Sequence, residues 1–231
     1  MSELVAYQFD DGIATLTLNN GKVNAFSPAL IAALHAGLDR AEADQAVVIL
    51  TGQPGILSGG YDLKVMMAGP QSAIDLVAQG SSLARRMLAH PFPLIVACPG
   101  HAVAKGAFVL LSADYRIGVE GPFSIGLNEV KIGLTMHHVG LILAQDRLTK
   151  PAFSRAVLNA EMFTPQGAHE AGFLDQVVAP EALMDTARAV AQQLKSLNMK
   201  AHKGTKLKAR KALLDALDAA IEADKAVSLM D

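Results

Sequence analysis

One carboxylate in this chain stands in a setting that suits acid–base chemistry. Glu129 lies in the segment F-S-I-G-L-N-E-V-K-I-G, surrounded by turn-forming and apolar residues. A glutamate enclosed by apolar groups has a raised pKa, so it can accept a proton and return it near neutral pH. The alternative is a structural carboxylate at a helix start or on the surface. We take Glu129 as the candidate general base.

Two glycine-containing loops could supply the electrophilic half of such a reaction. In S-G-G-Y-D-L-K (residues 58–64) the glycines permit a backbone in which the Tyr61 N–H points at a ligand oxygen. The loop G-H-A-V-A-K-G (residues 100–106) precedes a predicted helix, whose free N–H groups would attract an anion. Each could also be an ordinary strand-to-helix connection. With a base nearby, the two loops predict an oxyanion hole.

Other chemistry has less support in the sequence. Neither a G-x-G-x-x-G nor a G-x-x-x-x-G-K-[ST] pattern occurs, so dinucleotide and phosphate-loop sites are not predicted. His137 and His138 are adjacent and lack further ligands at a suitable spacing, which makes a poor metal site. We expect these histidines on the surface or in a pocket lining, and no bound metal.

The hydrophobic pattern predicts the elements that must position these residues. Two β-rich runs at 5–9 and 13–18 flank Asp10-Asp11-Gly12 and predict a hairpin. Apolar runs predict strands at 47–51 and 94–98, and a further strand is predicted at 115–119. Helical spacing predicts helices at 28–44, 72–90, 106–112, 141–148, 151–158, 165–171, 181–197 and 206–229. We therefore expect an α/β core at residues 1–178 and a helical C-terminal region at 179–231 that is not an independent domain.

Composition narrows the partners. Hydrophobic residues make up 51% and charged residues 18%, which predicts a globular protein with a large core. A net charge of −2 argues against nucleic acid, because neutralising phosphates requires a basic face. We see no secretory signal, and no apolar run reaches the roughly 18 residues that span a bilayer. The single cysteine, Cys98, fits a reducing compartment, so we expect a cytoplasmic protein without a membrane partner.

Several motifs in order along the chain resemble those of the crotonase (enoyl-CoA hydratase/isomerase) superfamily. They are L-N-N-G-K-V-N-A-F at 18–26, S-G-G-Y-D-L-K, P-G-H-A-V-A-K-G, A-D-Y-R-I at 113–117 and G-L-N-E-V-K-I-G. The resemblance implies an α/β spiral of ββα units with a C-terminal helical trimerisation region. It also implies homotrimers or pairs of trimers, no tightly bound cofactor, a coenzyme A thioester as substrate and a place in fatty acid metabolism.

The resemblance also assigns residues. It implies that the backbone N–H groups of Tyr61 and Lys105 form the oxyanion hole and that Glu129 is the base. It places the coenzyme A near Lys22, Val23, Ala25, Gly60, Asp62 and Lys64. Lys64 is a natural point-charge partner for phosphate, and its alternative is a solvated surface lysine.

One departure from the family pattern helps to choose the reaction. Hydratases of this family commonly carry three glycines and then a second glutamate at the second loop, where this chain has Ala104, Lys105, Gly106 and then Phe108. Hydration is best served by two carboxylates, whereas moving a double bond from C3 to C2 needs one base. The lack of the second glutamate at this loop, together with the motif G-L-N-E, resembles the Δ3-Δ2 enoyl-CoA isomerases and favours that reaction.

The sequence is compatible with two alternatives. A hydratase or another lyase of the family could use a different carboxylate, such as Asp62 or Glu120. A non-catalytic acyl-CoA-binding subunit would explain why Lys105 and Phe108 replace the expected residues. In every case the predicted helix 206–229 carries an apolar stripe suited to trimer packing, made of Leu207, Leu213, Leu214, Leu217 and Ile221.

Overall fold

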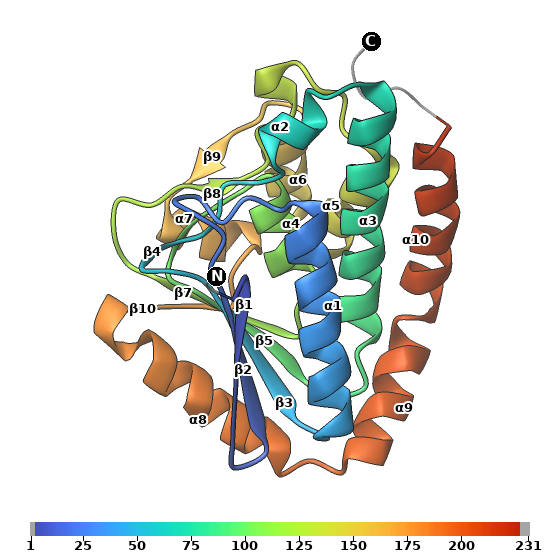
Figure 1. Ribbon diagram of the computed structural model, residues 1–231. Coiled ribbons are helices and arrows are strands. Elements are labelled where there is room, and N and C mark those ends of the chain that lie inside the picture. Colours follow the sequence, from blue (N-terminus) through green and yellow to red (C-terminus); the bar gives the residue numbers. More distant parts are fainter. Residues whose placement is uncertain (1–2, 227–231) are drawn as a thin grey trace.

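The structure is a computed structural model that describes residues 3–226. Its larger sheet has the strand order β1-β2-β3-β5-β7-β10 (Figure 1). These strands are β1 Val5–Asp10, β2 Ile13–Leu18, β3 Val47–Thr51, β5 Leu94–Cys98, β7 Tyr115–Val119 and β10 Gln176–Val178. β1 and β2 form the predicted antiparallel hairpin, and the remaining neighbours are parallel. Apart from the hairpin the sheet is parallel, as is usual in an α/β core.

Helices cover both faces of this sheet. Every residue of β3 is buried, because Val48 and Leu50 enter one apolar cluster while Val47 and Ile49 enter another on the opposite face. The first cluster includes α1 Pro28–Ala43, α3 Pro70–Ala89 and α4 Lys105–Leu111. The second is closed by α8 Leu183–Lys195, which lies along the other face of the sheet (Figure 1).

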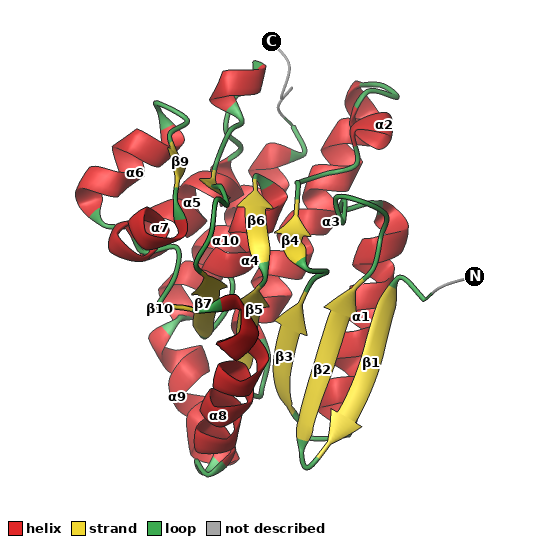
Figure 2. Ribbon diagram, turned by 90° about the vertical axis from the view of Figure 1, so that its left-hand side faces the viewer, coloured by secondary structure: helices red, strands yellow, loops and turns green. Residues whose placement is uncertain are grey.

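A second, smaller sheet was not predicted. It has the order β4-β6-β8-β9, with β4 Gly55–Ser58, β6 Gly100–Val103, β8 Ile125–Gly126 and β9 Met162–Phe163. The prediction of a loop at residues 100–106 was therefore wrong for its first half, which is β6. Figure 2 shows β4 and β6 beyond the upper ends of β3 and β5. Each long strand β3, β5 and β7 is thus followed by a short strand and then a helix, which repeats a ββα unit.

The remaining helices surround these layers. They are α2 Leu63–Met66, α5 His138–Arg147, α6 Lys150–Val157, α7 Pro165–Ala171, α9 Met199–Ala209 and α10 Lys211–Asp224, with single 3-10 turns at Val130–Ile132 and Pro180–Ala182. The ends of α1 follow the predicted signals, since the Ser27 hydroxyl accepts from the Leu30 N–H and Pro28 is the first helical residue.

The C-terminal prediction needs correction. The single helix expected at 206–229 is two helices that meet at Arg210, and residues 227–229 lie outside the described part. Arg210 donates to the Leu88 carbonyl oxygen at 2.8 Å and pairs with Asp114 at 2.8 Å, so tertiary contacts hold the break. Leu214, Leu217 and Ile221 are buried in the chain's own core, where α10 packs on α3 and α5.

Candidate active site

The three segments with candidate residues meet because of the smaller sheet. β4, β6 and β8 are parallel neighbours, so their carboxyl ends lie at one edge of that sheet. The chain leaves β4 toward Tyr61, β6 toward Lys105 and β8 toward Glu129. Loops at the carboxyl ends of adjacent parallel strands form a common crevice. The unpredicted sheet is therefore what brings the predicted residues together.

Backbone hydrogen bonds fix the segment around Val23 against the loop at Gly60. The Gly59 N–H donates to the Val23 carbonyl at 2.8 Å, and the Phe26 N–H donates to the Gly60 carbonyl at 2.8 Å. Asn24 adds to this attachment through its side chain, which donates to the Leu57 carbonyl at 3.2 Å. Asn24 is fully buried and has a φ of 46°, a conformation that asparagine tolerates better than most residues. The sequence pattern did not single it out.

The backbone conformation around Lys105 explains why a lysine is tolerated at a position where the family commonly has glycine. Lys105 is the first residue of α4 and has an ordinary negative φ, whereas the preceding Ala104 carries φ 50° and ψ −116°. The strained conformation thus falls on Ala104, whose N–H is held by the Gly126 carbonyl at 2.9 Å. The next position requires glycine, because a Cβ at Gly106 would lie 2.5 Å from the Ser58 carbonyl oxygen.

Two N–H groups remain free at this point. Among the described residues, neither the Tyr61 N–H nor the Lys105 N–H donates to a protein acceptor. The two loops are in contact, since a Cβ built on Gly60 would come within 3.9 Å of the Lys105 nitrogen and 3.3 Å of the Ala104 Cβ. The free donors therefore stand in adjacent loops, with the N-terminus of α4 behind one of them.

Glu129 is enclosed in the segment that follows β8. Its side chain is 8% exposed, and its Oε2 atom is buried without a hydrogen-bond partner in the described structure. Burial raises the pKa of Glu129 to about 7, partly offset by its own backbone N–H. Burial, and then the charges of Glu129 and Asp224, raise the pKa of the Tyr61 phenol, which places that phenol within electrostatic range of Glu129.

Phe108 stands at the position where the family resemblance places a second glutamate, and its side chain cannot transfer a proton. Phe108 is buried, and its ring meets the ring of His137 edge-on at 5.2 Å between centroids. Burial lowers the pKa of His137 far below its usual range, so the imidazole is neutral near pH 7. His138 instead pairs with Asp224, with 2.7 Å between Nδ1 and Oδ1. Adjacent in sequence, the two histidines therefore have different surroundings.

A match to a protein-family model identifies the family of the chain. The family model described as Enoyl-CoA hydratase/isomerase matches residues 8–229. The chain belongs to the enoyl-CoA hydratase/isomerase family. It has the crotonase fold, and proteins described as isomerases and as hydratases both occur among its relatives.

Three relatives of this family member illustrate the likeness. A crystal structure of an enoyl-CoA hydratase/isomerase family protein from Pseudomonas syringae is 72% identical with a TM-score of 0.97, covering 98% of each chain. A structure of an enoyl-CoA isomerase from Mycobacterium tuberculosis is 39% identical with a TM-score of 0.93, covering 98% of this chain and 99% of that one. The human mitochondrial enoyl-CoA delta isomerase 1 is 29% identical over 92% of this chain and 72% of its own length.

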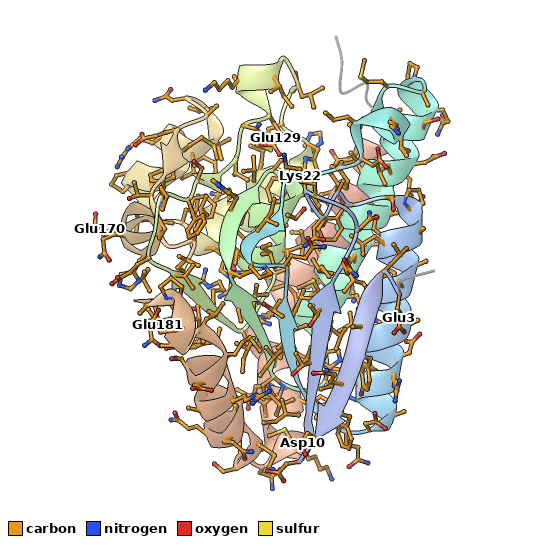
Figure 3. The ribbon with its side chains drawn as sticks, turned by 60° about the vertical axis from the view of Figure 1, so that its left-hand side comes forward. Glu3, Asp10, Lys22, Glu129, Glu170 and Glu181 are labelled. Carbon is orange, nitrogen blue, oxygen red and sulfur yellow. The ribbon has the colours of Figure 1, made fainter. Side chains whose placement is uncertain are left out.

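The residues that the resemblance assigned to coenzyme A lie around the same loops in this family member. Lys22, Val23 and Lys64 are exposed, Ala25 is half-buried and Gly60 is buried. Figure 3 shows Lys22 and Glu129 toward the same end of the molecule, opposite Asp10. Asp62 has a structural task, because its carboxylate accepts from the Lys64 N–H at 2.9 Å and caps α2.

Other polar residues of the family member act elsewhere. Glu120, weighed as an alternative carboxylate, is exposed at the end of β7. Asp114 forms an ion pair with Lys206 at 2.6 Å, and Arg116 forms one with Asp175 at 2.5 Å. Asp114 and Arg116 therefore do not form an ion pair with each other. Residues 3–226 contain no group of three or more His, Cys, Asp or Glu side chains placed to hold a metal. Within the same residues, no helix is long and apolar enough to cross a membrane.

Proposed function

We propose that the protein is a Δ3-Δ2 enoyl-CoA isomerase that uses Glu129 as its only acid–base group. The observation that carries this proposal is that Glu129 is buried without a hydrogen-bond partner at Oε2, while Phe108 occupies the position of the family's second glutamate. The isomerases among the relatives support the same reaction.

The proposed oxyanion hole makes the first proton transfer possible. The thioester carbonyl accepts hydrogen bonds from the Tyr61 and Lys105 N–H groups, and these bonds strengthen as negative charge develops on the oxygen. Loss of one such donor typically raises the barrier by roughly 3–4 kcal/mol. The resulting stabilisation makes the C2 proton acidic enough for a carboxylate to remove.

Glu129 then carries the proton from one carbon to another. The C2–H bond breaks, the proton passes to the Glu129 carboxylate, and the electron pair spreads over a dienolate that ends on the thioester oxygen. The protonated carboxyl returns its proton at C4, which leaves the double bond between C2 and C3. A pKa of about 7 suits both halves, because the group must act as base and then as acid near neutral pH.

Phe108 at the position of the family's second glutamate favours this reaction over hydration. A hydratase must position and deprotonate a water molecule, and Phe108 offers it neither a proton acceptor nor a hydrogen bond. The neutral His137 lies against the same phenylalanine ring. The coenzyme A part of the substrate is proposed to lie along Lys22, Val23 and Ala25, with Lys64 near its phosphates.

An isomerisation assay tests the proposal. Purified protein is mixed with trans-3-hexenoyl-CoA, and formation of the conjugated 2-enoyl thioester is followed by ultraviolet absorbance. We expect Glu129→Gln to lower kcat by about 10²–10⁴-fold, the usual contribution of a general base. Glu120→Gln is the matched control, because it removes an exposed carboxylate, and it should retain wild-type activity.

Three outcomes would refute the proposal. Undiminished activity of Glu129→Gln would remove the role assigned to that residue. Hydration of crotonyl-CoA at a rate well above isomerisation would instead identify a hydratase, and turnover of neither substrate despite tight binding would indicate an acyl-CoA-binding subunit.

A further inference from the structure

The buried charges of this protein fall into two groups. Arg116, Lys206 and Asp224 each have an oppositely charged or protonatable partner, at 2.5 Å from Asp175, 2.6 Å from Asp114 and 2.7 Å from His138 respectively. Within residues 3–226, the buried Lys105 and Glu129 have no ion-pair partner, not even each other. Both stand at the proposed active site. Glu129 has a task in the isomerisation, whereas the Lys105 side chain has none.

The surroundings of the Lys105 ammonium are incomplete for a buried charge. The side chain is 1% exposed, and its Nζ donates one hydrogen bond, to the Gly80 carbonyl oxygen on α3 at 2.5 Å. The rings of Phe26 and Tyr61 lie with their centroids 5.9 Å from Nζ. An ammonium has three donors, so two remain without an acceptor in the described residues. Burial lowers the pKa of Lys105 to about 7, which reflects this missing compensation.

The position of this ammonium relative to the thioester follows from the chain. Lys105 and Tyr61 are the residues whose N–H groups are proposed to hold the thioester oxygen, so the acyl group begins beside them. Their side chains both end at Gly80, because Nζ bonds its carbonyl and a Cβ there would lie 2.1 Å from the Tyr61 hydroxyl oxygen. The Lys105 ammonium and the Tyr61 phenol therefore both lie against α3 at Gly80.

We propose that the Lys105 ammonium binds a carboxylate at the far end of the acyl group, and that the substrates are coenzyme A thioesters of short unsaturated dicarboxylic acids. A carboxylate supplies the charge and the acceptors that the buried ammonium lacks. The acyl group is short, because four methylenes separate Nζ from the residue that holds the thioester oxygen. The inference rests on the proposed isomerase function for the position of the thioester.

A pair of substrates that differ only at the far end tests this subsite. They are trans-3-hexenoyl-CoA and the coenzyme A monothioester of trans-3-hexenedioic acid, which have the same length and the same double bond. We expect the wild type to favour the carboxylate-ended substrate in kcat/KM. Lys105→Met keeps the backbone N–H and the length of the side chain but removes the charge. It should shift the ratio of the two kcat/KM values toward the methyl-ended substrate by at least about 30-fold.

Binding of saturated analogues separates this inference from the isomerase proposal. Titration calorimetry with adipyl-CoA and hexanoyl-CoA needs no reaction, so tighter binding of adipyl-CoA to the wild type supports the subsite even if no double bond moves. Isomerisation of hexenoyl-CoA without any preference for adipyl-CoA would overturn the subsite and leave the isomerase standing. An equal fall in kcat/KM for both substrates in Lys105→Met would also overturn the proposed subsite.

Two further variants complete the design. Lys208→Met removes an exposed lysine on α9 and should leave the substrate ratio unchanged. Lys105→Gln, which keeps a polar group without charge, should lose the preference as well and serves if the methionine variant does not fold. The comparison of the two analogues on the wild type stands without any variant.

Discussion

At the scale of single residues, the candidate site combines a backbone strain with two unpaired charges. Ala104 accepts the positive φ that a glycine would usually take, which leaves Lys105 free to begin α4 with its N–H exposed to a ligand. Such a conformation costs of order 1–3 kcal/mol and persists because neighbouring contacts hold it. The side chains of Lys105 and Glu129 are both buried, and neither has an ion-pair partner among residues 3–226. A bound substrate can therefore offset the free energy that burying these two charged groups costs in the folded protein.

The raised pKa of Glu129 predicts the pH dependence of the reaction. The base must be ionised before it removes the C2 proton, so kcat/KM for trans-3-hexenoyl-CoA should fall about tenfold per pH unit below pH 7. Steady-state kinetics between pH 5 and 9 measure this limb. Lys105→Met should retain it, because that variant still carries Glu129. A flat profile down to pH 5 would show that the ionising group is not a buried carboxyl.

The site residues differ in how far sequence could predict them. Glu129, Tyr61 and Lys105 could be named because their types and neighbours match motifs that are local in sequence. The buried course of the Lys105 side chain could not, because it depends on Gly80 and Phe26, which come from distant segments. Asn24 escaped notice for the same reason, since its bonding to the Leu57 carbonyl spans 33 residues.

At the scale of elements, the long strands were predictable and the short ones were not. β3 and β5 are largely apolar runs of five residues, β7 is a five-residue strand that includes Arg116, and the predicted bounds of all three are confirmed. β8 and β9 have two residues each, too few for any periodicity, and β4 and β6 have four residues that begin with glycine. These short strands pair only because the longer ones have already aligned them. The smaller sheet is thus a consequence of tertiary structure.

A helix glycine provides the prediction at this scale. Gly80 lies inside α3, where a Cβ would meet the Tyr61 phenol at 2.1 Å from its oxygen and 2.7 Å from two ring carbons. We expect Gly80→Ala to lower the free energy of unfolding by about 1–3 kcal/mol, because the rigid ring must move. It should also lower kcat, since Tyr61 carries one of the proposed oxyanion donors. Chemical denaturation and the isomerisation assay measure the two effects.

Gly204 provides the matched control for this substitution. It also lies inside a helix, α9, but a Cβ there would have no neighbour within 4 Å. Gly204→Ala should raise the free energy of unfolding by up to about 1 kcal/mol through helix propensity. An equal rise in the free energy of unfolding for Gly80→Ala and Gly204→Ala would contradict the close packing of Tyr61 on α3.

At the scale of the whole molecule, the C-terminal helices belong to the core of the chain. α8 covers one face of the larger sheet, and α10 packs on α3 and α5 (Figure 1). Much of the stripe expected to pack in a trimer is therefore already used inside the chain. Large apolar side chains are exposed elsewhere, at Leu63 (65%), Met67 (81%) and Ile132 (53%). Exposed apolar side chains mark a surface that binds a partner when they form one contiguous patch.

The oligomeric state is the prediction at this scale. From the family resemblance and these exposed side chains we expect three or six copies in solution. Light scattering after size-exclusion chromatography measures the mass directly. A single copy at micromolar concentration would contradict the expected trimer, and it would mean that the active site is complete within one chain.

The bonding of Asp224 to the start of α5 has a consequence for the order of folding. Its carboxylate accepts from the His138 and Val139 N–H groups at 2.8 and 3.1 Å, although 86 and 85 residues separate the partners. Closing so long a loop is slow compared with forming a helix, so α5 should stay uncapped until α10 docks. His137, which packs on Phe108, immediately precedes these residues. Hydrogen exchange at the His138 and Val139 amides should therefore report the moment at which this wall of the site becomes rigid.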